Sequence, residues 1–156
     1  MPATDPTARH QHPTRPPQLL KVTIYHNYEA GFMPYTDGQL LTAVTCHWLE
    51  TTTNGDPLTV AEWAFRTFNA DLDLLEQHRA TAGGETTFLA AAVYRLLGHR
   101  SLSVGDVVEI QTGPHRQWLA CDRVGWRPIN APSRLAGAPL TAATVYQHLT
   151  DRRTAR

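Results

Sequence analysis

Two kinds of hydrophobic spacing alternate along this chain, and they predict strands toward both ends with helices between them. Apolar residues recur at every second position over Leu20–His26 and again over Leu40–Trp48, which is typical of β-strands. Loop residues between the two segments, including Gly31, favour a hairpin. The alternation places Val44 and Cys46 on one face of the second strand.

The middle of the chain shows helical spacing. Thr59 and Glu62 are three residues apart, as in a capping box, so we expect a helix to begin at Thr59. Trp63 lies opposite the apolar side of this helix, so it either covers a second element or is exposed as a contact residue. A second helix is expected over 86–97. Its expected inner side consists of Phe88, Leu89, Ala92, Val93 and Leu96.

Turn residues in the last third of the chain are spaced for a small antiparallel meander. Strands are expected over 107–110, 117–122 and 126–129. Asp122 and Gly125 occupy the first and fourth positions of a turn, and Gly125 is expected to have a positive φ. Three prolines favour loop structure after this meander, and Thr141 is expected to cap a short final helix that ends near Leu149.

These elements predict an α+β fold: a mainly antiparallel sheet, including a C-terminal three-stranded meander, covered by two helices. The 156 residues suffice for one core. We expect a disordered, proline-rich leader over 1–18, a single α+β domain over 19–150 and a basic, frayed tail over 151–156.

Composition and charge narrow the classes of function. The 14 basic and 14 acidic residues balance, which argues against a surface built as a whole to attract polyanions. The two cysteines exclude a disulfide framework and favour a reducing compartment. No apolar run of membrane-spanning length occurs, so we expect a soluble, cytoplasmic protein with no membrane partner.

One stretch resembles a known family. Tyr94–Val108, which contains Ser101-Leu-Ser-Val-Gly-Asp106, is followed by Trp118–Asp122 and by Gly125-Trp126, and together these segments resemble the YodL-like domain. Glu62–Asn69 is similar to a helix found upstream of that run in small uncharacterised actinobacterial proteins. Many of those proteins are encoded on plasmids, phages and other mobile elements. The resemblance implies an accessory protein of that kind and provides no catalytic residues.

The spacing of reactive side chains does not favour an enzyme. Cys46, Cys121, His26 and His47 would have to converge from separate strands, and none of the usual metal-binding or nucleophile motifs is present. We therefore expect no catalytic residues, no metal and no cofactor. A cysteine-dependent enzyme is the least favoured alternative.

The remaining hypotheses concern binding. We expect a non-catalytic binding or regulatory module that acts through an unidentified protein partner. The alternative is a single-stranded nucleic-acid-binding protein, in which basic and aromatic residues of the meander share a face, as single-strand binders require. The opposing interpretation buries the two tryptophans of the meander and leaves the arginines as solubilising groups. The candidate binding residues are Trp63, Arg100, Arg116, Trp118, Arg123, Trp126 and Arg127.

Overall fold

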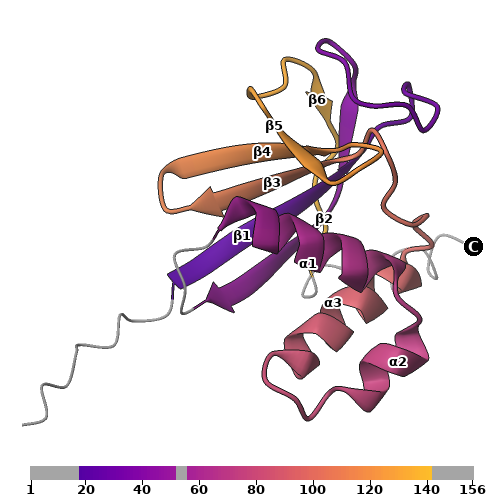
Figure 1. The fold of residues 1–156 in the computed structure, drawn as a ribbon, viewed down its shortest axis with the longest axis vertical. Helices are drawn as coiled ribbons and strands as arrows, with labels where there is room; N and C mark the ends of the chain where they lie inside the picture. Colours follow the sequence, from indigo (N-terminus) through magenta and orange to yellow (C-terminus); the bar gives the residue numbers. More distant parts are fainter. Residues whose placement is uncertain (1–17, 52–55, 142–156) are drawn as a thin grey trace, which may run out of the picture.

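The structure is a computed structural model that describes residues 18–51 and 56–141, and it confirms the predicted α+β fold. Within these residues the chain forms one sheet and three helices (Figure 1). The predicted tail, the predicted final helix beyond Thr141 and the predicted leader, apart from Gln18, lie outside the described residues. None of the described helices is long and apolar enough to cross a membrane.

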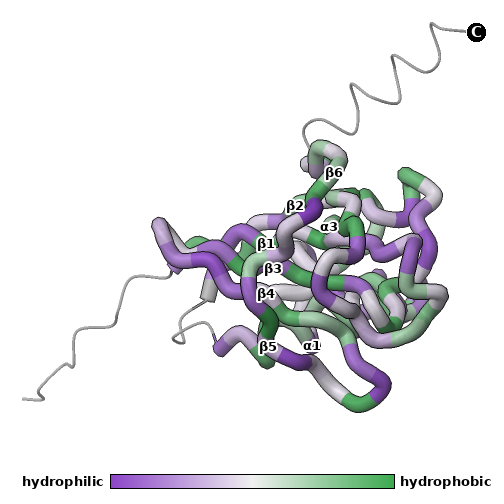
Figure 2. Tube along the Cα trace, turned by 90° about the horizontal axis from the view of Figure 1, so that it is seen from above, coloured by the Kyte–Doolittle hydropathy of each residue, from purple (hydrophilic) through white to green (hydrophobic). Residues whose placement is uncertain are grey.

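Six strands form the sheet in the order β5-β4-β3-β1-β2-β6, which can be followed from edge to edge in Figure 2. All neighbours are antiparallel except β2 and β6. The predicted meander is present as β3, β4 and β5, and Gly125 in its second turn has a φ of 73°, as predicted. The strands are Gln18–His26 (β1), Leu41–Thr51 (β2), Val107–Thr112 (β3), His115–Cys121 (β4), Trp126–Ile129 (β5) and Leu135–Ala136 (β6).

Helices cover one face of this sheet. Helix α1 (Pro57–Asn69) contacts β3 and β4, and α3 (Gly84–Leu96) contacts β2 and α1. The short helix α2 (Leu72–Gln77) was not predicted; it packs against α3 (Figure 1). The largest buried side chains between helices and sheet are those of Leu20, Ile24, Phe68, Tyr94, Leu102 and Ile110.

The opposite face of the sheet encloses a second apolar cluster. Tyr25 of β1, Trp118 of β4 and Leu41 of β2 are buried there, together with Tyr35 from the loop that joins β1 and β2. Because both faces are covered, β1 is buried continuously from Val22 to His26. Both faces of β1 are therefore buried, although its alternation of apolar and polar residues is typical of a strand with one buried face.

Helix α1 corrects the predicted N-terminus at Thr59. The N-cap is Asp56, whose Oδ1 accepts a hydrogen bond from the amide of Leu58 at 3.3 Å. Pro57 follows at the first helical position, where its fixed φ suits the helix and its missing N–H costs nothing. Thr59 instead donates its hydroxyl to Asp56 Oδ2 at 3.3 Å.

Helix α3 corrects the predicted inner side. Ala90, Ala91 and Tyr94 are buried, whereas Leu89 and Leu96 are 49% and 64% exposed. Two alanines allow α3 to lie close to its neighbours, and Tyr94 has a buried hydrogen-bond partner on β1. Hydrophobic periodicity alone indicates neither the close helix packing nor the buried hydrogen bond of Tyr94.

An irregularity in β2 corrects the expected facing of Val44. The register between β1 and β2 shifts after Ile24, so that Tyr25 pairs with Ala43. Val44 packs with the cluster beneath the helices, while Cys46 lies opposite Thr23 on the other face. A β-bulge adds one residue to one strand and so reverses the facing of the residues beyond it.

Candidate functional site

The two tryptophans of the meander lie on opposite faces of the sheet. Trp118 is 7% exposed and packs against Tyr25, with 5.4 Å between ring centroids, inside the second apolar cluster. Trp126 is half-buried against the cluster beneath the helices. Trp118 and Trp126 therefore do not form the shared stacking face that the nucleic-acid hypothesis requires.

The other predicted aromatic residue, Trp63, belongs to the helical layer. Its ring lies in contact with Phe68, and its indole Nε1 donates to the hydroxyl of Thr87 on α3 at 3.0 Å. Trp63 thus covers a second element, which is one of the two alternatives left open by the sequence.

Arg100 is held in an ion pair with a buried carboxylate. The Asp106 side chain is fully buried and accepts hydrogen bonds from the two Arg100 terminal nitrogens at 2.6 and 2.8 Å. The backbone amides of Asn27 and Ser103 donate to the same carboxylate at 2.9 and 2.8 Å. Four donors thereby join the segment before β3 to the end of β1.

A buried histidine continues this network toward α3. The hydroxyl of Tyr94 lies 2.6 Å from His26 Nε2 and 2.5 Å from the carbonyl oxygen of Arg100. A hydroxyl has one hydrogen, and a carbonyl can only accept, so Tyr94 donates to Arg100 and accepts from His26. Neutral His26 is therefore protonated on Nε2, and Nδ1 accepts from the Tyr28 hydroxyl at 3.3 Å.

Beyond this network, apolar side chains project into solvent. Tyr28, Phe32 and Met33, in the loop between β1 and β2, are 63%, 64% and 51% exposed. The Arg100 guanidinium lies 5.6 Å from the ring centroids of both Tyr28 and Phe32. Arg123, from the turn between β4 and β5, donates to the sulfur of Met33 at 3.3 Å. We call these five residues the tip surface.

The backbone beneath the tip surface is tightly constrained. Asn27 is buried; its side-chain oxygen accepts from the amides of Glu29 and Ala30, and its amide nitrogen donates to Gln39. Gly105 lies so close that a Cβ there would stand 2.5 Å from the Met33 carbonyl oxygen. The exposed loop is therefore held in one conformation by buried groups.

Phe32 itself has a strained backbone. Its φ is 65°, and within the described residues it is the single non-glycine residue with a positive φ. A bulky side chain rarely adopts this conformation, which costs on the order of 1–3 kcal/mol and persists only where the surroundings impose it. The strain turns a large aromatic ring outward, and such strain concentrates at functional positions.

Most of the arginines between Arg100 and Arg134 are paired with carboxylates. The ion pairs neutralise much of the positive charge that would otherwise attract the phosphate groups of a nucleic acid. Arg123 has no carboxylate within 4 Å among the described residues. The pairs are Arg100 with Asp106, Arg127 with Asp122 at 3.1 Å, Arg134 with Glu29 at 3.5 Å and Arg116 with Glu109 at 3.8 Å.

The thiols are not arranged for nucleophilic chemistry. Burial raises the pKa of the Cys121 thiol to about 11, and burial also raises the pKa of Cys46. Nucleophilic cysteines need the opposite shift, because the thiolate is the reactive form. Among the described residues, no three or more histidine, cysteine or acidic side chains are grouped so that they could hold a metal ion.

Of the seven residues proposed from the sequence, the structure brings Arg100 and Arg123 to the tip surface. Sequence reasoning missed Tyr28, Phe32 and Met33, which lie in a loop without periodicity. A signal was present, since Phe32 and Met33 are flanked by Gly31 and Pro34, and loop residues normally lie at the surface.

Comparison with known proteins finds no relative from which a function could be inferred. No family model matches the chain, and neither a curated protein nor a solved structure resembles it significantly.

Proposed function

We propose that this protein is a non-catalytic binding module, with a regulatory or accessory role, that recognises a protein partner through the tip surface. The observation that supports this most directly is the outward-facing Phe32, held at a φ of 65° beside exposed Tyr28 and Met33. Aromatic residues, methionine and arginine are enriched in protein interfaces and dominate their energetics.

Rigidity strengthens this proposal. Ordering a flexible loop reduces affinity, whereas a surface already held in its binding conformation avoids that cost. Here the Asp106 carboxylate and the Asn27 side chain fix the loop in advance. The tip surface is therefore suited to binding without rearrangement.

The charge distribution favours a protein over a nucleic acid as the partner. Sequence-independent nucleic-acid binding depends on unpaired cations that release counterions from phosphates. Arg100 shares its charge with Asp106, and Trp118 is too deeply buried to stack on a base. A partner with an apolar patch and a few polar groups fits the tip surface better.

The biological setting is part of the same proposal. The two free thiols suit a reducing compartment, so we place the interaction in the cytoplasm. The resemblance of the Ser101–Asp106 run to the YodL-like domain fits an accessory protein of a plasmid, phage or other mobile element that acts by binding a component of the cell.

Photo-crosslinking tests this proposal. Phe32 is replaced by a photoreactive benzoyl-phenylalanine, and Leu89 on the outer side of α3 serves as the matched control position. After illumination in the native cell, we expect a specific protein adduct from position 32 and none from position 89, both before and after nuclease treatment. Adducts to nucleic acid, or equal adducts from both positions, would overturn the proposal.

A further inference from the structure

One buried imidazole connects the tip surface to the interior of the protein. His26, at the end of β1, is 0% exposed. Its Nδ1 lies 3.3 Å from the hydroxyl of Tyr28 in the tip surface, and its Nε2 lies 2.6 Å from the hydroxyl of Tyr94 in α3. A change at this ring therefore reaches an exposed residue of the candidate binding surface directly.

The neutral ring holds Tyr28 through a lone pair. Tyr94 donates its hydrogen to the carbonyl oxygen of Arg100, so Nε2 of His26 carries the ring hydrogen. Nδ1 is then an acceptor only, and the Tyr28 hydroxyl donates to it. A proton bound to Nδ1 would occupy this lone pair and remove the acceptor.

A charged His26 would have no free counter-ion. Asp106 is the carboxylate that faces the ring, and its two oxygens already accept four hydrogen bonds, two of them from Arg100. Burial lowers the pKa of His26 to about 4, and the attraction of Asp106 offsets only part of this effect. The other charged or titratable groups that face the ring are those of Arg100, His99, Tyr28 and Tyr94.

Movement of Tyr28 is the smallest change that would hydrate this charge. A buried charge without a partner is far less stable than a hydrated one. Tyr28 is 63% exposed, so its ring can yield Nδ1 to water, whereas Tyr94 is buried against Phe68 in the helical layer. When Tyr28 leaves, the Arg100 guanidinium loses one of the two aromatic rings that it faces.

We propose that protonation of His26 releases Tyr28 from the tip surface and thereby weakens binding of the partner. This inference rests on the proposed function, because it concerns the regulation of the same surface. While His26 is neutral, Tyr28 and Phe32 both stay beside Arg100, and the surface keeps its binding shape. The partner and the proton exclude each other, so a bound partner also makes His26 harder to protonate.

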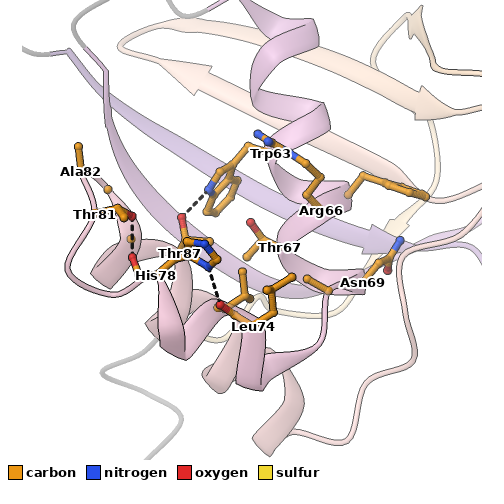
Figure 3. A pocket seen from close by; sticks show the side chains of 14 residues that line it. Trp63, Arg66, Thr67, Asn69, Leu74, His78, Thr81, Ala82 and Thr87 are labelled. Carbon is orange, nitrogen blue, oxygen red and sulfur yellow. Dashed lines mark hydrogen bonds between the residues drawn. The ribbon is translucent and has the colours of Figure 1, made fainter.

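NMR of the isotope-labelled protein tests the release without the partner. The ring signals of His26 and Tyr28 are followed from pH 7 to below pH 4, together with two reference signals. These are the indole N–H of Trp118 in the second apolar cluster and that of Trp63, which is bonded to Thr87 in the helical layer (Figure 3). We expect His26 and Tyr28 to shift with a common midpoint near pH 4, while both indole signals remain those of the folded protein.

Variants assign the effect to His26. In His26→Gln the side-chain amide can replace both ring nitrogens as a hydrogen-bond partner but does not titrate, so the Tyr28 signal should no longer respond. His47→Gln is the matched control, because His47 is also buried and burial also lowers its pKa to about 4; the Tyr28 titration should be unchanged.

A second variant applies if His26→Gln does not fold. Tyr28→Phe removes one hydroxyl at an exposed position. The neutral His26 ring then loses a hydrogen bond, so His26 should bind a proton about fivefold more tightly. An unchanged midpoint of His26 in this variant would show that Tyr28 does not hold the neutral ring.

The partner captured by crosslinking at position 32 provides the second measurement. Because the protonated protein does not bind, the dissociation constant should rise about twofold at the midpoint of His26 and about tenfold one pH unit below it. His26→Gln should not show this dependence.

Three results would overturn the inference. A Tyr28 signal that stays fixed while His26 titrates shows that the ring is not released. Indole signals that change before His26 or together with it show general unfolding instead. A partner affinity that does not follow the His26 titration excludes the regulation. Absence of any adduct at position 32 refutes the proposed function instead, and the spectra of the free protein still decide whether Tyr28 is released.

Discussion

Arg100 and Asp106 are joined by two hydrogen bonds, at 2.6 and 2.8 Å, and the Asp106 carboxylate in this pair is wholly buried. The pair joins the tip surface to the buried residues beneath it, because the same Arg100 guanidinium faces Tyr28 and Phe32. One ion pair therefore connects the stability of the fold to the shape of the candidate binding surface.

Replacing this carboxylate should destabilise the protein strongly. Asp106→Asn preserves the size of the side chain but leaves Arg100 without a counter-charge, and removing one partner of a buried pair costs about 3–5 kcal/mol. Arg100 is partly exposed, so we expect the lower end of that range, about 3 kcal/mol, in urea unfolding. Glu85→Gln, which breaks the fully exposed pair with Arg79, is the control and should have a far smaller effect. Equal losses of unfolding free energy in the two variants would show that the buried pair stabilises the protein no more than the exposed pair does.

Stability should fall when the solution is acidified. Burial lowers the pKa of both His26 and His47 to about 4, and burial lowers the pKa of His99 as well. Between about pH 6.5 and pH 4 these histidines bind protons in the unfolded chain but not in the folded chain, so the free energy of unfolding falls as pH falls through this window. Above the window the histidines are neutral in both states and contribute no pH dependence. At pH 5 we expect a loss of about 2 kcal/mol for each of His26 and His47, relative to pH 7.

The variant His47→Gln isolates one contribution to this pH dependence. Glutamine can still bond to Thr45, which lies 2.9 Å from the His47 ring nitrogen, but it does not titrate. Its free energy of unfolding should therefore fall less between pH 7 and pH 5 than that of the wild type. A wild-type stability that is flat over this range would contradict the prediction.

Two glycines in the positive-φ region should respond differently to alanine. At Gly105, with a φ of 94°, an added Cβ would meet the Met33 carbonyl oxygen at 2.5 Å and the Ala30 Cβ at 3.0 Å. At Gly125, with a φ of 73°, no heavy atom lies within 4 Å of the added Cβ. We expect Gly125→Ala to cost about 1 kcal/mol through its backbone alone, and Gly105→Ala about 3 kcal/mol. If chemical denaturation gives equal losses of unfolding free energy for the two variants, the loop that carries Met33 can move away from the added Cβ at position 105 without cost.

The N-terminus of α1 offers a test of the corrected helix boundary. Asp56→Ala should cost about 1 kcal/mol, because it removes the acceptor for the amide of Leu58. Thr59→Ala should cost only a few tenths of that amount, since Thr59 merely supports Asp56. A larger effect at Thr59 than at Asp56, in thermal unfolding, would restore the capping box of the sequence analysis.

Strands β1 to β5 could be predicted because their signal is local, whereas β6 lies where the prolines favoured a loop. A period of two marks β1 and β2, and turn residues such as Asp122 and Gly125 mark the meander. These patterns depend on residues that are close in the sequence, so they predict the strands without knowledge of the tertiary contacts. The α+β class followed from them.

The candidate site could not be predicted in the same way because it is built from contacts distant in sequence. Tyr28 is close to Arg100, and Met33 to Arg123, only because the fold brings two loops together. The curl that buries Trp118 against Tyr25 likewise depends on the whole sheet. Residue type left open whether the tryptophans of the meander are buried or form an exposed basic and aromatic face, and tertiary packing buries Trp118 and exposes other aromatic residues.

The affinity of a tip variant for the partner identified by crosslinking tests the central claim most directly. Phe32→Ser should raise the dissociation constant about tenfold or more, as expected at an interface hot spot, without lowering the melting temperature, because the ring is 64% exposed. Leu89→Ser, an equally polar change at an exposed position on α3, should leave the affinity within about twofold. Unchanged affinity of Phe32→Ser, or an equal loss in both variants, would contradict the assignment of the tip surface as the binding site.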